Sequence, residues 1–163
     1  MRGPMPSFPP NFSLAELTRS DRATKLGIAN VPSPEHEANL AALAHAVLQP
    51  LRDHFGVPIP VSSGYRSPKL NAATPGASVT SQHSLGQAVD LDMKRSTNAK
   101  GVTNAALFHY IRQNLPFDQL IWEAGDKKEP SWVHVSWRES KRRGSMLRMT
   151  RKNGATLYAP WTP

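Results

Sequence analysis

The sequence contains no cysteine. No disulfide can therefore cross-link the chain, and a metal ion would have to be held by histidine and carboxylate side chains instead of thiolates. The same absence excludes cysteine-based zinc fingers and catalysis by a thiol nucleophile. With 163 residues, the chain can still form a hydrophobic core, because a domain of this size buries roughly two-thirds of the surface that its unfolded chain exposes.

Long hydrophobic runs are also missing. No window approaches the ~20 apolar residues of a membrane span, and the N-terminal stretch MRGPMPSFPPNF lacks the apolar segment of a signal peptide. We therefore expect a protein made in the cytoplasm that does not insert into a membrane. No internal repeat or low-complexity tract divides the chain, so we predict one domain over residues 1–163, with a proline-rich flexible arm over residues 1–12.

Positive charge dominates the composition. Twenty lysines and arginines against 12 acidic residues give a formal charge of +8, which favours contact with anionic polymers such as nucleic acid, acidic lipid or anionic cell-wall material. Much of this charge lies in a basic C-terminal segment, residues 138–163. We interpret it as a solvated positive face that keeps the protein on anionic envelope material. A nucleic-acid-binding arm is the alternative, but a basic run without interleaved aromatic residues offers little base stacking.

Two amphipathic patterns predict longer helices, over residues 33–56 and 104–115. The first begins with Ser33 as N-cap and Pro34 at the first helical position, and Gly56 should end it, while Pro50 should bend it. A shorter helix should follow Ser13, which stands in capping-box spacing with a glutamate. Phe12 and Leu17 would form the hydrophobic staple of this short helix. The apolar stripe of the long helix consists of Leu40, Leu43, Ala44, Val47, Leu48, Leu51 and Phe55.

Four short runs are typical of β-strands. They are IPVSS (59–63), QAVDLDM (87–93), QLIWEA (119–124) and WVHVSW (132–137), and the last two, separated by GDKKEPS, predict a hairpin. Because side chains alternate along a strand, Asp90 and Asp92 share one face while their apolar neighbours share the other. The same rule places Trp132, His134 and Ser136 together opposite the core face of their strand.

Taken together, these positions indicate a metal site. His83 precedes a glycine turn, Asp90 lies on the next strand and His134 on another, which gives three ligands and leaves a fourth zinc position open, the arrangement of catalytic sites. The glycine turn in SGYRSPKLN would present Arg66, a residue suited to a substrate carboxylate. Taken singly, each position also fits an ordinary strand or surface residue. Four further histidines on predicted helices are interpreted as surface or packing residues: His36, His45, His54 and His109.

SGYRS, SQHSLGQAVDLD and WVHVS, in this order over residues 63–136, resemble the zinc peptidases that cleave peptidoglycan stem peptides. That family includes D-Ala-D-Ala carboxypeptidases, vancomycin-resistance dipeptidases and phage endolysins of the L-Ala-D-Glu type. The resemblance implies an α+β fold with a central antiparallel sheet and flanking helices, as in the hedgehog signalling domain. It also implies one Zn²⁺ per chain on His83, Asp90 and His134, with Arg66 facing the substrate. We assign Ser81 and Trp132 to substrate binding as well.

The chain departs from the family at the catalytic base. Many members carry an acidic residue three positions before the last histidine, where this sequence has Ser131. We predict Glu123 as the base, because an antiparallel register that pairs Glu123 with Trp132 sets its side chain on the metal-facing side. The alternatives are Glu129, in the hairpin loop, which could fold back toward the metal, and a purely structural Glu123 that pairs with a surface lysine.

We therefore expect a monomeric zinc metallopeptidase that hydrolyses an amide bond in bacterial peptidoglycan. A phage endolysin, made in the host cytoplasm and acting at the cell wall, is the favoured interpretation. The alternatives are a D-Ala-D-Ala carboxypeptidase or dipeptidase of wall remodelling and a non-catalytic zinc-containing domain that binds the wall or a virion. Nucleic acid is not an expected partner.

Overall fold

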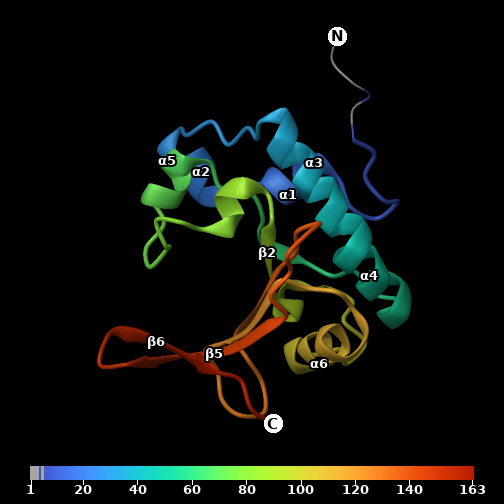
Figure 1. Cartoon of the computed structure of the whole chain (residues 1–163), viewed down its shortest axis with the longest axis vertical. Coiled ribbons are helices and arrows are strands. Elements are labelled where there is room, and N and C mark those ends of the chain that lie inside the picture. Colours follow the sequence, from blue (N-terminus) through green and yellow to red (C-terminus); the bar gives the residue numbers. More distant parts are fainter. Residues whose placement is uncertain (1–3, 5) are drawn as a thin grey trace.

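The structure is a computed structural model that describes residue 4 and residues 6–163. Figure 1 shows helices gathered around a twisted sheet, with the C-terminal hairpin reaching out from it. The elements are α1 (Leu14–Thr18), α2 (Asp21–Leu26), α3 (Pro34–Leu43), the π-helical turn η1 (Ala44–Leu48), α4 (Gln49–Phe55), β1 (Val61–Ser63), α5 (Pro68–Ala72), the 3-10 turn η2 (Gln82–Leu85), β2 (Ala88–Leu91), the 3-10 turn η3 (Met93–Arg95), α6 (Asn104–Asn114), β3 (Gln119–Glu123), β4 (Trp132–Ser136), β5 (Ser145–Lys152) and β6 (Ala155–Pro160).

The six strands form one sheet in the order β1-β2-β4-β3-β5-β6. The α+β class is confirmed, but the sheet is mixed, because β3 and β5 run parallel while every other neighbouring pair is antiparallel. Gln119, at the start of β3, lies between Ser136, where β4 ends, and Ser145, where β5 begins. A short loop across the start of β3 therefore places β5 on its other side.

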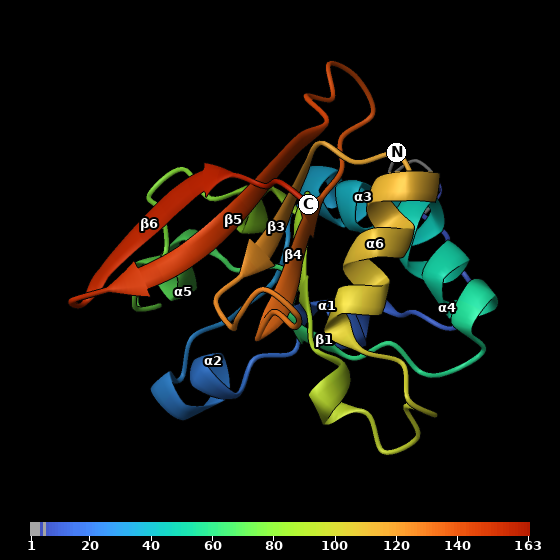
Figure 2. The ribbon, with the colours of Figure 1, turned by 90° about the horizontal axis from the view of Figure 1, so that it is seen from below.

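The long helices cover one face of the sheet. Figure 2 shows α3, α4 and α6 on the same side of the strands. The stripe predicted for residues 33–56 is buried there together with α6 and the apolar strand face, and the core includes Leu40, Leu43, Val47, Leu51, Leu107, Phe108, Ile111, Val89, Leu91, Leu120, Trp122, Val133 and Val135. Burying these side chains supplies the main driving force for folding. The opposite face of β2 and β4 remains available for polar side chains.

The predicted helix signals are present. The Ser13 and Ser33 side chains each accept a hydrogen bond from a backbone N–H in the first turn of α1 and α3. Gly56 ends α4 in the left-handed region, with φ +66°, which glycine adopts without steric cost. The π-helical turn η1 directly precedes α4, in which Pro50 stands at the start, and proline has no N–H to donate to the helix.

Residues 7–12 of the predicted arm contact the rest of the domain. Phe12 is buried in the core, and Asn11 exchanges hydrogen bonds of 3.1 and 2.8 Å with the Gln49 side chain. His45 Nε2 lies 3.0 Å from the Ser7 carbonyl. Residues 1–3 and 5 of that arm lie outside the described residues. Within the part of the chain that is described, no helix has the length and hydrophobicity needed to cross a membrane.

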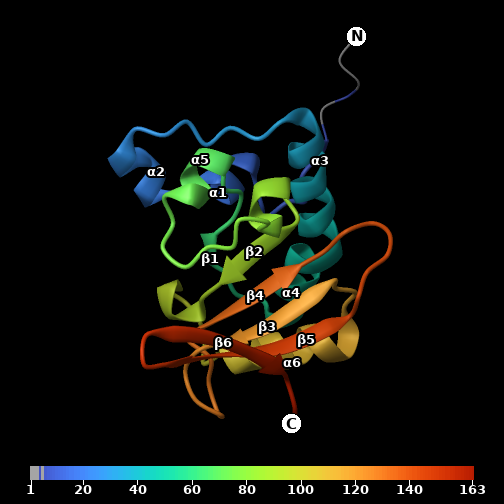
Figure 3. The same cartoon turned by 60° about the vertical axis from the view of Figure 1, so that its left-hand side comes forward.

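The basic C-terminal segment contains two strands that were not predicted from the sequence. Residues 145–160 form an antiparallel hairpin that extends the sheet through β5, and Figure 3 shows this hairpin along the sheet edge beside β3. Asn153 and Gly154 turn it with φ of +52° and +77°, the conformation that an Asn-Gly hairpin turn adopts. Met149 is buried, while every residue of β6 is exposed.

Candidate active site

Three predicted metal ligands meet on the polar face of the sheet. His83 comes from η2, Asp90 from β2 and His134 from β4, where Asp90 and His134 are direct cross-strand partners. His83 Nε2 lies 3.4 Å and His134 Nδ1 lies 3.0 Å from Asp90 Oδ1. The ligand atoms of all three residues lie within 4.8 Å of one another. The register of two central strands thus brings together residues that are far apart in the sequence.

Close backbone packing sets the orientation of His83. Its Nδ1 lies 2.8 Å from the Gly64 carbonyl, so the Nε2 atom faces Asp90. A Cβ on Gly64 would lie 2.1 Å from the Leu17 carbonyl oxygen, which means that only glycine lets this turn approach α1. Metal-ligating histidines commonly bond a backbone carbonyl through their other ring nitrogen, and this fixes the tautomer.

The donor set suits zinc. Two donors on one tetrahedral zinc ion lie roughly 3.3 Å apart, given zinc–ligand bonds of roughly 2.0–2.1 Å. The two separations to Asp90 Oδ1 are 3.4 and 3.0 Å, and all three ligand atoms lie within 4.8 Å of one another. Burial of Asp90 opposes its ionisation, but the neighbouring His83 and His134 outweigh this and hold the pKa of Asp90 well below its ordinary value. The Asp90 side chain is therefore a carboxylate at neutral pH.

Glu123 lies on the same cleft wall. The predicted register is confirmed, because Glu123 pairs with Trp132 and Ile121 pairs with His134, and all four side chains line the cleft that holds the three ligands. The Glu123 residue is 5% exposed, and its Oε2 has no hydrogen-bond partner among the described residues. Burial raises the pKa of Glu123 to about 7, and the Asp90 charge adds to this, while His134 and Arg151 act in the opposite direction.

The acidic residues of the hairpin loop are engaged elsewhere. The Glu129 carboxylate accepts hydrogen bonds from the backbone N–H groups of Asn104 (3.2 Å) and Ala105 (2.6 Å) at the start of α6. Asp126 accepts from the N–H groups of Lys128 and Glu129 within the loop. Neither residue lines the cleft. The Glu129 carboxylate caps the N-terminus of α6. It therefore does not fold back toward the metal ligands, as it would have to do to act as the catalytic base.

The three predicted substrate-binding residues also line this cleft. The Arg66 guanidinium donates a 3.3 Å hydrogen bond to Ser81 Oγ, and the Ser81 hydroxyl also accepts from the His83 N–H at the first turn of η2. The backbone N–H of Arg66 donates a 3.1 Å hydrogen bond to the backbone carbonyl of His83. Arg66 and Ser81 are thus fixed to the segment that carries His83. Trp132 is the cross-strand partner of Glu123.

Part of the cleft wall was missed in the sequence. The C-terminal hairpin contributes Met149, Arg151, Thr156 and Tyr158, and the loop before it contributes Arg143. The Asn-Gly pair at 153–154, flanked by alternating apolar residues, was a hairpin signal that could have revealed these strands. Their attachment to β3 depends on tertiary pairing that no local pattern encodes.

The remaining histidines have structural surroundings. His54 stacks on Tyr110 with ring centroids 3.9 Å apart, and the His109 ring lies against Trp122 and Trp161. Asp92, the second aspartate of its strand face, caps η3 instead of facing the cleft. Among the described residues, the only group of three or more His, Cys, Asp or Glu side chains that could hold a metal ion is His83, Asp90 and His134.

A two-histidine, one-carboxylate cluster beside a buried carboxylate, in an open cleft on a mixed sheet, defines a metal-dependent hydrolase. The family model described as Peptidase M15 matches residues 10–136, and the chain belongs to this family. It is therefore a metallopeptidase of a zinc-dependent family that acts on peptidoglycan. No curated protein matches the chain. The family match confirms the resemblance seen in the three sequence motifs.

Proposed function

We propose that this protein is a phage endolysin that hydrolyses an amide bond in peptidoglycan stem peptides. The observation that carries this proposal is the shared cleft, in which the His83, Asp90 and His134 cluster lies beside the buried carboxylate of Glu123. The formal charge of +8 supports action on an anionic wall. In this proposal the protein is made in the host cytoplasm, acts as a monomer at the wall and binds no nucleic acid.

The proposal assigns one zinc ion per chain to His83, Asp90 and His134. Bound zinc would supply Lewis-acid chemistry, by polarising the scissile carbonyl and lowering the pKa of a water molecule. Three protein ligands leave room for substrate, as catalytic zinc sites require. The Gly64 carbonyl, bonded to His83 Nδ1, would keep the histidine in the tautomer that offers Nε2.

Glu123 is the proposed proton acceptor. Its carboxylate would take the proton of the attacking water and deliver it to the leaving amine, as general base and then general acid. A pKa raised to about 7 by burial suits a group that must both accept and donate a proton near neutral pH. Arg66 would bind a substrate carboxylate through charge-assisted hydrogen bonds and so orient the scissile bond, with Ser81 and Trp132 shaping the site.

Two alternatives remain as proposals. Arg66 in the cleft favours a D-Ala-D-Ala carboxypeptidase or dipeptidase, because such an enzyme must recognise a terminal carboxylate. A non-catalytic zinc domain that binds a wall or virion needs no base. The buried Glu123 beside the ligand cluster therefore disfavours the binding-domain alternative, because burying an acidic side chain that has no partner costs folding free energy.

Digestion of purified peptidoglycan, followed by mass analysis of the fragments, tests the proposed function. An endolysin releases new amino termini inside the stem peptide and solubilises the wall. Release of single D-alanine residues without solubilisation would identify a carboxypeptidase. No cleavage by zinc-loaded protein would leave only the binding role.

A further inference from the structure

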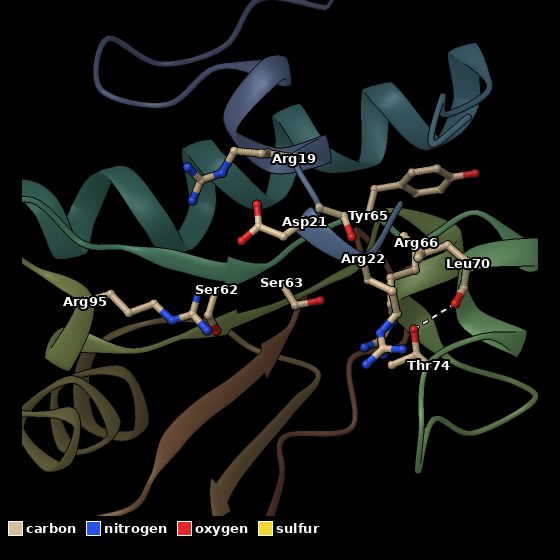
Figure 4. Close-up of a pocket in the computed structure, with 11 residues that line it drawn as sticks. Arg19, Asp21, Arg22, Ser62, Ser63, Tyr65, Arg66, Leu70, Thr74 and Arg95 are labelled. Atoms are coloured by element: carbon tan, nitrogen blue, oxygen red, sulfur yellow. Dashed lines mark hydrogen bonds between the residues drawn. The ribbon is translucent and has the colours of Figure 1, made fainter. Parts of the chain in front are cut away.

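A second pocket adjoins the active-site cleft. We call it the basic pocket, and define it by the four arginines that line it, Arg19, Arg22, Arg66 and Arg95. Figure 4 shows Arg95 on one side of this space and Arg22 and Arg66 on the other. The walls come from α2 and the turn before it, from β1 at the sheet edge, and from η3. The pocket therefore lies on the side of the cleft opposite the C-terminal hairpin.

The charges in the basic pocket are unbalanced. One aspartate, Asp21, lines it beside the four arginines. Among the described residues, Arg95 alone of these four is in an ion pair, at 3.9 Å from Asp92, and Arg22 uses one nitrogen on the Ala73 carbonyl at 3.3 Å. Arginine stays charged in proteins. The charges of Asp90 and Glu16 act on Arg66 and Arg19, but among the described residues Asp21 is the only acidic residue in the lining, so the four guanidinium groups leave it with excess positive charge. Guanidinium groups bind carboxylate and phosphate oxygens in a bidentate manner.

Arg66 connects the basic pocket to the active site. Arg66 and Thr74 line both spaces, and the Arg66 N–H is bonded to the carbonyl of the metal-ligand candidate His83. The guanidinium of Arg66 donates to Ser81 through one terminal nitrogen, while its buried Nε has no partner among the described residues. An unsatisfied buried donor points to an acceptor supplied by a ligand. A ligand in the cleft can thus continue past Arg66 into the second space.

We propose that the basic pocket is a second substrate subsite, which binds an additional oxyanion of the peptidoglycan strand while the scissile bond lies at the cleft. This inference rests on the proposed function and deepens it, since it specifies a substrate with at least two anionic groups. The oxyanion is a carboxylate of the stem peptide or a phosphate of a polymer attached to the wall. Either group fits arginines that approach from two sides.

Paired charge-removing variants test the subsite. Arg22→Gln is compared with Lys25→Gln, an exposed residue of the same helix outside both spaces, and Arg95→Gln with its neighbour Lys94→Gln. Each protein is assayed on a soluble, phosphate-free stem peptide with free carboxylates and on its amidated form. We expect Arg22→Gln and Arg95→Gln to raise KM at least about fivefold on the free-carboxylate peptide. Their kcat, their zinc content and their KM on the amidated form should remain at wild-type values.

Further assays separate the two sources of the anion. One outcome is that the arginine variants match wild type on soluble peptides but cleave sacculi less well. If that difference disappears when phosphate polymers are stripped from the sacculi, the subsite binds phosphate. Arginine variants that match their lysine controls on every substrate, while the wild-type enzyme cleaves peptidoglycan, would overturn the subsite alone. A wild-type enzyme that releases no new amino termini from peptidoglycan would instead overturn the proposed function, and the subsite with it.

Discussion

At the scale of single residues, Glu123 and Glu129 show how position decides the role of a carboxylate. The first is buried at the end of β3, with one oxygen unpartnered beside the ligand cluster. The second bonds two N–H groups at the start of α6. Both stand near the hairpin in the sequence, and the strand register separates them. The antiparallel pairing of Glu123 with Trp132 that was assumed from the sequence is present, but the partner of Glu129 could not be foreseen, because α6 approaches the loop only in the folded chain.

Glu123→Gln should keep both fold and zinc while losing activity. Glutamine preserves the shape of the side chain but cannot accept the proton of the attacking water, and a well-placed general base contributes about 10²- to 10⁴-fold in rate. We expect a loss of that order in kcat on a peptidoglycan fragment, measured beside zinc content and circular dichroism. A fully active variant would leave the mechanism without its proton acceptor.

His83→Ala, Asp90→Ala and His134→Ala should each lose the metal. With two donors remaining, the site no longer offers the three protein ligands of a catalytic zinc centre. Elemental analysis after dialysis measures the loss, and His54→Ala serves as a control, because His54 stacks on Tyr110 away from the cluster. Full zinc retention in His134→Ala would contradict the ligand assignment.

Metal-free protein should reveal the buried charge of Glu123 through the pH dependence of its stability. Since the folded-state pKa is raised from 4.5 to about 7, stability from this group is fully present below pH 4.5 and is lost as pH rises toward 7. The Glu123→Gln protein avoids this loss. Urea unfolding in chelator should therefore find the variant more stable than wild type by roughly 3 kcal/mol at pH 8, and equal to it at pH 4. Equal stability at both values would show that the folded and unfolded states bind this proton alike.

At the scale of elements, local signals predicted α1, the long helix that the structure divides into α3, η1 and α4, helix α6 and four of the strands, whereas α2 and α5 were not predicted. Caps at Ser13, Ser33 and Gly56 are sequence features that act within one turn, and the structure contains all of them. The hairpin of residues 145–160 was missed because the basic residues of this segment were interpreted as a solvated face, although the Asn-Gly pair at 153–154 is a hairpin signal. Its parallel pairing with β3 is a long-range contact, and no window of sequence contains both partners.

Glu129→Gln should affect α6 more than catalysis. The carboxylate accepts hydrogen bonds from two backbone N–H groups and places negative charge at the N-terminus of α6. Replacing it with the neutral amide of glutamine should lower the free energy of unfolding by about 1 kcal/mol. We expect a lower urea midpoint, with kcat changed less than about threefold. A large loss of activity without loss of stability would move the base into the loop.

At the scale of the whole molecule, the net positive charge should affect how fast the enzyme binds the wall more than which peptide bond it cleaves. If the formal charge of +8 draws the enzyme to an anionic polymer, lysis of sacculi should fall steeply as salt shortens the Debye length below ~10 Å. A small soluble peptide with one carboxylate should be cleaved at nearly constant rate over the same range. Equal salt dependence on both substrates would mean that salt acts on the catalytic step.

The C-terminal hairpin supplies one wall of the cleft, yet it lies beyond the residues that the family model matches. It joins the sheet through a single neighbour, β3, and among its residues only Met149 is buried. Arg151, Thr156 and Tyr158 can therefore be exchanged without disturbing His83, Asp90 or His134. This makes the hairpin suitable for protein engineering: libraries confined to Thr156 and Tyr158 would retarget the enzyme to other wall chemistries while His83, Asp90 and His134 stay in place, and Arg151 would be kept because its charge acts on the pKa of Glu123.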